Sequence, residues 1–157
     1  MAYGSVKVDS IVTSTKTVTV DNLVATSAIG TSVQGYDVDT AKTDVAQIFT
    51  AAQRGTISAL TDGATITPDF AVANNFSVTL GGNRTLANPS NLTAGQSGCI
   101  WITQDATGSR TLAYGSSWDF AGGTAPTLTT TASARDCLVY AVQSTTQITA
   151  TLIKGLA

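Results

Sequence analysis

The side chains that most often perform catalysis are scarce in this sequence. It contains no histidine, and all ten of its acidic residues are aspartate. Histidine is the most versatile acid and base near neutral pH and the commonest metal ligand. Serine and threonine are abundant, but a hydroxyl nucleophile needs an activating base, and none is evident beside them. We therefore expect no catalytic residue and no enzymatic activity.

Three aspartates, Asp105, Asp119 and Asp136, are candidates for the carboxylate pair that hydrolyses a glycoside. Each of them lies in a turn-like context, where aspartate commonly bonds its own backbone. A structural role is therefore favoured for all three. A glycan-cleaving enzyme remains a third hypothesis, behind two hypotheses that need no catalysis.

Metal and cofactor motifs are also incomplete. Asp37 and Asp39, with Asp44 beyond them, offer oxygen ligands for Ca²⁺, but the spacing of a calcium loop fails after the second aspartate and no glutamate closes it. The glycine pairs at 81–82 and 122–123 lack the following helix that a phosphate-binding loop requires. We expect turn carboxylates and turn glycines, with neither a metal nor a cofactor.

Four aromatic residues offer the one recognisable binding chemistry, a platform on which sugar rings stack. Trp101 and Tyr140 lie in strand-like runs and are expected in the core or at a subunit interface. Trp118 lies beside serine and glycine pairs and is the most plausible exposed aromatic. Trp118 and Tyr114 are therefore the candidate ligand-binding or interface aromatics.

The composition points to a protein that packs against other protein. Charged residues make up 11% of the 157 residues, the net charge is −2, and 28 residues are threonine. Ordinary globular domains contain about 25% charged residues, so hydroxyls, amides and glycine must cover this surface. The scattered lysines and arginines predict no nucleic-acid partner. No run reaches the roughly 20 apolar residues of a membrane span, so no membrane is expected.

The stretch 98–115 carries the strongest β signal. Two β-branched and aromatic runs, joined by a short polar segment with glycine, predict a β-hairpin. In the first run Cys99 and Trp101 point to one face, and Ile100 and Ile102 to the other. Both faces are thus largely apolar, which is typical of a strand covered on both sides. A second sheet or a neighbouring subunit must supply that cover.

The two cysteines, Cys99 and Cys137, each lie inside an apolar strand-like run. Because of this apolar context, reduced and buried thiols are the favoured interpretation. A disulfide stays open as an alternative if the two strands prove adjacent.

Residues 1–24 alternate apolar and polar positions and predict an arm of two short strands. A lone two-stranded ribbon is barely stable in water, so the arm is expected to lie on the body of the molecule or on a partner. The apolar residues expected to make that contact are Val6, Val8, Ile11, Val18 and Val20. An irregular linker follows, and then a short amphipathic helix near 41–53.

From Gly55 onward the pattern is β-like throughout. About eight to ten short strands with frequent turn residues predict an all-β fold, more specifically an antiparallel β-sandwich or jelly-roll-like module. The short connections favour mostly antiparallel pairing. The expected domains are an N-terminal arm, linker and helix at 1–54 and a β-sandwich module at 55–157.

Several segments of the sequence are distinctive and occur in a fixed order. They are Val45–Thr56, Ala59–Ile66, Gly81–Leu86, Asn91–Gly98 and Gly108–Leu112, preceded by the opening Ala2–Asp9. Together they resemble the C-terminal modules of structural and fibre proteins of tailed bacteriophages, notably short-tailed phages of aquatic bacteria and cyanobacteria. The resemblance covers most of residues 45–154.

That resemblance implies a virion component, commonly trimeric, with no enzymatic role. Because the chain has no extended shaft repeat, we expect a capsid decoration or cement protein, or a short head fibre, that binds the major capsid protein or other virion proteins through its arm. The alternative is a tail-fibre or receptor-binding adhesin that recognises a host surface glycan. In either case we expect the chain to form a homotrimer that is part of the virion and is assembled in the host cytoplasm.

Overall fold

The computed structural model describes residues 10–13, 16–19 and 52–156. The chain divides into two compact units, residues 1–52 and 53–157. In the first unit, β1 (Ser10–Thr13) pairs antiparallel with β2 (Lys16–Thr19), with Ile11 opposite Val18. The other expected arm contacts, Val6, Val8 and Val20, and the helix expected near 41–53, lie outside the described residues.

The second unit is built of short strands, so the expected all-β class is confirmed. Its strands are β3 (Ile57–Ala59), β4 (Thr65–Ile66), β5 (Asn75–Leu80), β6 (Arg84–Leu86), β7 (Ser97–Gln104), β8 (Leu112–Tyr114), β9 (Trp118–Phe120), β10 (Arg135–Ser144) and β11 (Gln147–Leu156). A 3₁₀ turn, η1 (Ala121–Gly123), follows β9. Within residues 52–156 the strands form a six-stranded sheet and a three-stranded sheet.

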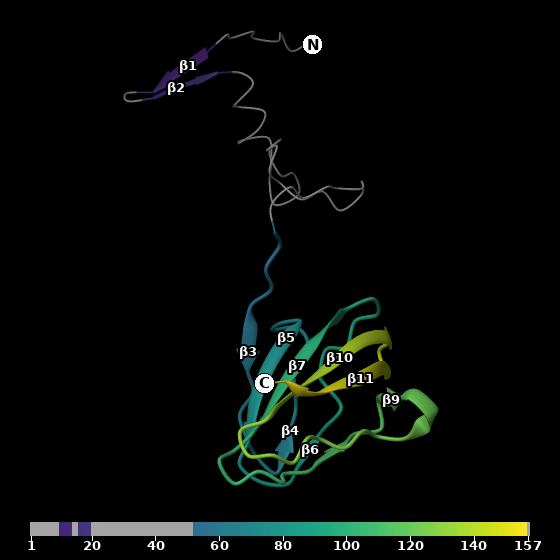
Figure 1. Cartoon of the computed structure of the whole chain (residues 1–157). Helices are drawn as coiled ribbons and strands as arrows, with labels where there is room; N and C mark the ends of the chain where they lie inside the picture. Colours follow the sequence, from purple (N-terminus) through teal and green to yellow (C-terminus); the bar gives the residue numbers. More distant parts are fainter. Residues whose placement is uncertain (1–9, 14–15, 20–51, 157) are drawn as a thin grey trace. The chain divides into compact units, whose positions relative to one another are not determined.

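The first six of these strands wind as a coil between the two sheets (Figure 1). β3, β5 and β7 lie side by side and parallel in the six-stranded sheet, and β4, β6 and β8 do the same in the three-stranded sheet. The chain therefore crosses from one sheet to the other after every strand. Two stacked rows illustrate the register, namely Ser58, Phe76 and Ile100 in the larger sheet and Ile66, Leu86 and Tyr114 in the smaller one.

The last strands complete the larger sheet, whose order is β3-β5-β7-β10-β11-β9. β10 pairs antiparallel with both β7 and β11, and the short turn after Ser144 joins β10 to β11 as a hairpin. β9 then pairs parallel with β11 at the far edge, with Trp118 opposite Ile148. This hairpin is the long antiparallel element of the module.

The expectation of mostly antiparallel pairing is wrong. Five of the seven strand pairs within residues 52–156 are parallel, and the hairpin expected at 98–115 is absent because β7 and β8 belong to different sheets. A short connection joins antiparallel neighbours only when the chain turns back within one sheet. From β3 to β8 each connection crosses to the opposite sheet, so the following strand of the same sheet runs in the original direction.

The hydrophobic core draws residues from both sheets. Its most buried members include Ile66, Phe70, Phe76, Leu80, Leu86, Ile100, Ile102, Leu138, Tyr140 and Ile148. Burying each large apolar side chain contributes about 1.5–3 kcal/mol. Along β7, Ile100 and Ile102 are buried whereas Cys99, Trp101 and Thr103 are only half-buried. Within this single chain the strand is thus fully covered on one face only.

Asparagine side chains support the turns of the coil. Asn83 Oδ1 accepts a hydrogen bond from the backbone N–H of Thr111 at 3.0 Å, and Asn88 Oδ1 accepts one from the N–H of Ser117 at 2.8 Å. Both bonds link consecutive turns of the coil. They satisfy backbone donors that no strand partner reaches, as protein turns require.

Candidate functional site

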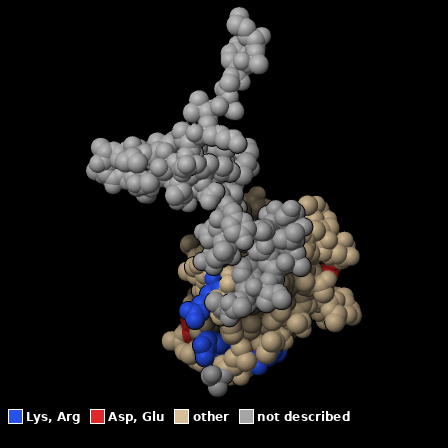
Figure 2. All heavy atoms as spheres, turned by 90° about the horizontal axis from the view of Figure 1, so that it is seen from above, with Lys and Arg blue, Asp and Glu red and all other residues tan. Residues whose placement is uncertain are grey.

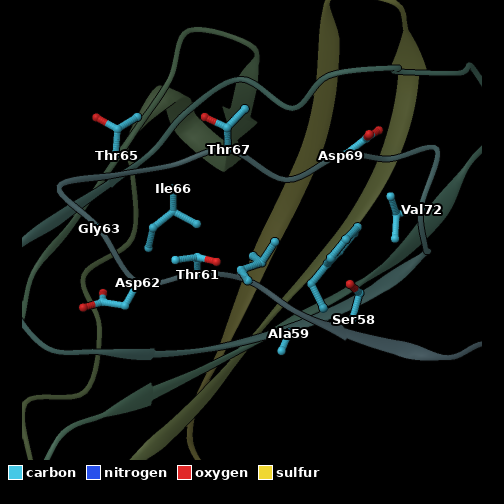
Figure 3. Close-up of a pocket in the computed structure, with 12 residues that line it drawn as sticks. Ser58, Ala59, Thr61, Asp62, Gly63, Thr65, Ile66, Thr67, Asp69 and Val72 are labelled. Atoms are coloured by element: carbon cyan, nitrogen blue, oxygen red, sulfur yellow. The ribbon is translucent and has the colours of Figure 1, made fainter.

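A pocket of about 400 Å³ opens at the first turn of the coil (Figure 3). Residues 58–63, from β3 and the turn after it, form one side, and residues 65–72 contribute the other. Phe76 of β5 completes the lining. Cavities of roughly 300–1,000 Å³ are typical of small-ligand sites, so this one has the size of a binding pocket.

The pocket exists because β3 is an edge strand of the larger sheet. The first turn of the coil therefore has a neighbouring turn on one side only within residues 52–156. The backbone hydrogen bonds that attach it to the next turn include one from Leu60 N–H to Ser77 O at 2.8 Å and one from Phe70 N–H to Ser90 O at 3.0 Å. Its other side leaves the lining open to a ligand.

Asp62 is held rigidly in the turn between β3 and β4. Its carboxylate accepts two hydrogen bonds from Arg84, at 2.8 Å from Nε and 2.6 Å from Nη2, and a longer one from the N–H of Gly81 at 3.3 Å. The Arg84 hydrogen bonds lower the pKa of Asp62 below its ordinary value. The Asp62 carboxylate balances the positive charge of the Arg84 guanidinium, so this end of the pocket carries no net positive charge.

Asp69 lies at the other end of the pocket, beside Val72 (Figure 3). Its Oδ1 accepts hydrogen bonds from Asn91 Nδ2 at 2.7 Å and from the N–H of Ala71 at 2.9 Å. The Asn91 hydrogen bond is the main cause of a lowered Asp69 pKa. The carboxylate is therefore ionised at neutral pH and fixed in orientation.

The remaining lining combines hydroxyl and apolar groups. Ile66 points toward Thr61 and β3, whereas Thr65 and Thr67 point to the opposite side of their segment (Figure 3). Ile66 is 2% exposed and forms part of the core, while Val72 at the rim is 65% exposed. The lining thus combines hydroxyls, the fixed carboxylate of Asp69 and an apolar surface, whereas the Asp62 carboxylate points away from Thr61 and Ile66 (Figure 3).

The expected exposure of Trp118 is wrong. The side chain is 5% exposed, and its Nε1–H donates to the carbonyl oxygen of Ala87 at 3.0 Å. Pairing of β9 with β11 directs the indole into the core, where it packs edge-on against Phe70 and Tyr140. With its single donor satisfied, Trp118 offers nothing to a ligand at the surface.

Tyr114 is also placed differently from the expected platform. It is half-buried and packs edge-on against Phe120, with ring centroids 4.7 Å apart. Its hydroxyl is buried and has no hydrogen-bond partner among the described residues, and burial raises its pKa. Tyr114 and Trp118 therefore pack in different aromatic groups rather than side by side.

Two of the three candidate glycosidase aspartates hold loops in place. Asp105 pairs with Arg110 at 2.7 Å and accepts hydrogen bonds from the N–H groups of Thr107 and Gly108. Asp136 is 2% exposed and accepts hydrogen bonds from Thr129 N–H at 2.7 Å and Gly155 N–H at 2.8 Å. Asp119 is exposed on β9.

The part of the chain that the structure describes presents neither a metal-ligand cluster nor a membrane-spanning helix. There, no group of three or more potential ligand side chains gathers in one place, and no helix has the length and apolar character needed to span a bilayer. The calcium candidates Asp37, Asp39 and Asp44 lie outside the described residues.

The pocket residues were missed by sequence reasoning. The glycine pair at 81–82, which precedes Arg84, is predicted as turn glycines, and the structure places it between β5 and β6. The ion pair between Asp62 and Arg84 forms only because successive turns of the coil stack on each other. The hydrogen bond between Asp69 and Asn91 depends on the same stacking. A search for charged and amide side chains in successive turns of the sequence would have identified these pairs.

Comparison with known proteins gives one family match for this chain. Residues 66–137, somewhat less than half of the chain, match a family described as "Putative phage tail fibre C-terminal domain". Searches of curated proteins and of solved structures gave no match. The match confirms the resemblance to phage structural proteins, and a domain of this kind implies that the protein is a component of the phage virion. Within the class of virion components it is a fibre-type structural protein with a β-rich C-terminal module.

Proposed function

We propose that this chain forms the distal part of a phage tail fibre and that residues 53–157 contact the host surface. The single observation that carries the proposal is the tail-fibre match over residues 66–137. That stretch runs from β4 into β10 and so contains most of the coil. The match favours the tail-fibre alternative over capsid decoration, which nothing in the matched region supports.

The proposed role is adhesion without catalysis. Two of the candidate glycosidase aspartates, Asp105 and Asp136, accept hydrogen bonds from backbone amides and so serve loop structure. Histidine is absent from the sequence. A fibre tip needs only a rigid surface that binds repeatedly, because several weak contacts in one fibre combine into strong attachment.

The proposed fibre is a homotrimer whose copies meet at the outer face of the larger sheet. Apolar side chains cross that face on neighbouring strands, with Cys99 opposite Val139 and Trp101 opposite Cys137. Ile57, Val139 and Ile153 on this sheet are 55%, 37% and 49% exposed. Only scattered blue and red patches interrupt the tan surface of the described residues in the view from above (Figure 2). With 11% charged residues and a net charge of −2 in the whole sequence, charge repulsion between copies is weak.

The location of the chain in the virion tests the proposal. An epitope tag inserted in the exposed turn at Thr145–Thr146 is expected to leave the fold intact, because this turn projects from the β10–β11 hairpin. Labelled antibody viewed by electron microscopy is expected at the tail. Label distributed over the capsid shell would overturn the tail-fibre proposal and restore capsid decoration.

A further inference from the structure

We propose that the pocket at the first turn of the coil is a binding site for a neutral sugar of the host surface. The inference rests on the proposed adhesion function and assigns it to particular residues. The site lies between residues 58–63 and residues 65–72 and is bounded at its ends by Asp62 and Asp69 (Figure 3).

Pre-set acceptors are the first feature that fits a sugar. Each sugar hydroxyl must donate a hydrogen bond when it leaves water, and a carboxylate oxygen is the strongest acceptor among side chains. Asp69 is oriented by Asn91, by the N–H of Ala71 and by Ser90. A carboxylate has about four acceptor sites, so these bonds fix Asp69 and still leave it capacity for a ligand.

An apolar surface beside the acceptors is the second feature. A sugar ring presents C–H groups on its faces and hydroxyls at its edge, so it needs both kinds of contact. Val72 is 65% exposed at the rim, next to Asp69 in Figure 3. Covering this side chain with the C–H face of a sugar ring removes apolar surface from water and so favours binding.

Charge selects neutral sugars over acidic ones. Both charged groups in the lining, Asp62 and Asp69, are carboxylates. The nearest guanidinium, that of Arg84, already makes two hydrogen bonds to Asp62. A uronic or sialic acid carboxylate would meet Asp69 without a cation to offset the repulsion, and like charges in contact disfavour binding.

The experiment uses the full-length chain and an array of neutral and acidic bacterial oligosaccharides. Wild-type protein is expected to bind neutral members, and the affinity of Asp69→Asn for them is expected to fall by roughly tenfold or more, as for a lost charge-assisted hydrogen bond. Val72→Asp is expected to remove binding by placing a second charge at the rim. Asp119→Asn, an exposed carboxylate on β9, is the matched control and should bind like wild type.

Adsorption to host cells separates the possible failures. If the chain binds cells but no neutral sugar, or if Asp69→Asn and Val72→Asp bind neutral sugars like wild type, the pocket assignment is overturned while adhesion stands. If the chain fails to bind cells at all, the proposed function falls as well. Circular dichroism of each variant verifies its fold, and Val72→Thr, which keeps the β-branched shape, replaces Val72→Asp if that variant unfolds.

Discussion

Tyr140 donates its hydroxyl hydrogen to the backbone carbonyl oxygen of Asn74 at 2.8 Å. The bond links the central antiparallel strand β10 to the segment that enters β5, two parts of the module far apart in sequence. The ring of Tyr140 lies in the core, stacked on Phe70 with centroids 4.6 Å apart. One residue thus contributes apolar burial and satisfies a carbonyl group at the edge of the core.

Tyr140→Phe is expected to destabilise the protein, because it leaves the Asn74 carbonyl without this donor. The expected loss is about 0.5–1.5 kcal/mol in the free energy of unfolding, typical of one part-buried hydrogen bond. Tyr114→Phe is the matched control, since the buried Tyr114 hydroxyl has no partner among the described residues. That control is expected to be neutral or stabilising in urea unfolding. Equal losses for the two variants would contradict the role of the Asn74 bond.

Gly98→Ala is expected to be strongly destabilising. A Cβ atom at Gly98 would overlap the backbone carbonyl of Asn74, which cannot move as a flexible side chain can. Overpacking of this kind costs about 1–3 kcal/mol or more. Gly63→Ala is the control, because its Cβ would meet only Thr65 O at an ordinary 3.5 Å. A thermal unfolding midpoint equal to wild type for Gly98→Ala would show that the Asn74 segment shifts freely.

Alkaline pH is expected to destabilise the fold. Burial raises the pKa of Cys137 from 9.0 to about 11, and burial also raises the pKa values of Tyr114 and Tyr140. The folded state therefore holds these protons where the unfolded state releases them. Stability from Cys137 is complete below about pH 9 and is lost as the pH rises toward 11. Urea unfolding between pH 7 and pH 11 measures this, and a flat profile for the wild type would contradict it.

Cys99 and Cys137 are expected to stay as free thiols under mild oxidation. Their strands, β7 and β10, are adjacent, but Cys99 lies opposite Val139 and Cys137 lies opposite Trp101. The cysteines are therefore diagonal neighbours, about 7–8 Å apart between Cα atoms, whereas a disulfide needs about 4.4–6.8 Å. Alkylation after denaturation, followed by mass spectrometry, should label both thiols. A single oxidised species without label would show that the strands rearrange.

The outer face of the larger sheet is expected to hold the copies together. In the double variant Val139→Lys, Ile153→Lys, charges replace two exposed apolar side chains, so the trimer is expected to dissociate without loss of the fold. Ala113→Lys on β8, an exposed position on the other sheet, is the control. Light scattering during size-exclusion chromatography of the full chain measures the mass. A monomeric wild type would refute the proposed trimer.

Particular residues show how much of the fold can be predicted from the sequence. Alternation around Ile100 and Ile102 correctly marked the strand, because a side-chain period of two is a local property of extended chain. Glycine and asparagine correctly marked the turn at 81–83 for the same reason. The expected cover over both faces is present on one face only within the single chain. Pairing direction was predicted wrongly, since it depends on whether each turn returns within one sheet or crosses to the other.

Composition and local pattern by themselves determined the all-β class, the turns and the low-charge surface, since these follow from residue types and their spacing. Only the tertiary structure decided that Trp118 is buried, that Arg84 binds Asp62, and that Asp69 and Val72 share a pocket. Each of these depends on which turns of the coil stack together, and stacking is set by contacts between residues distant in the sequence. No local pattern encodes that choice, because the free energy that fixes it arises only when both sheets close on one core.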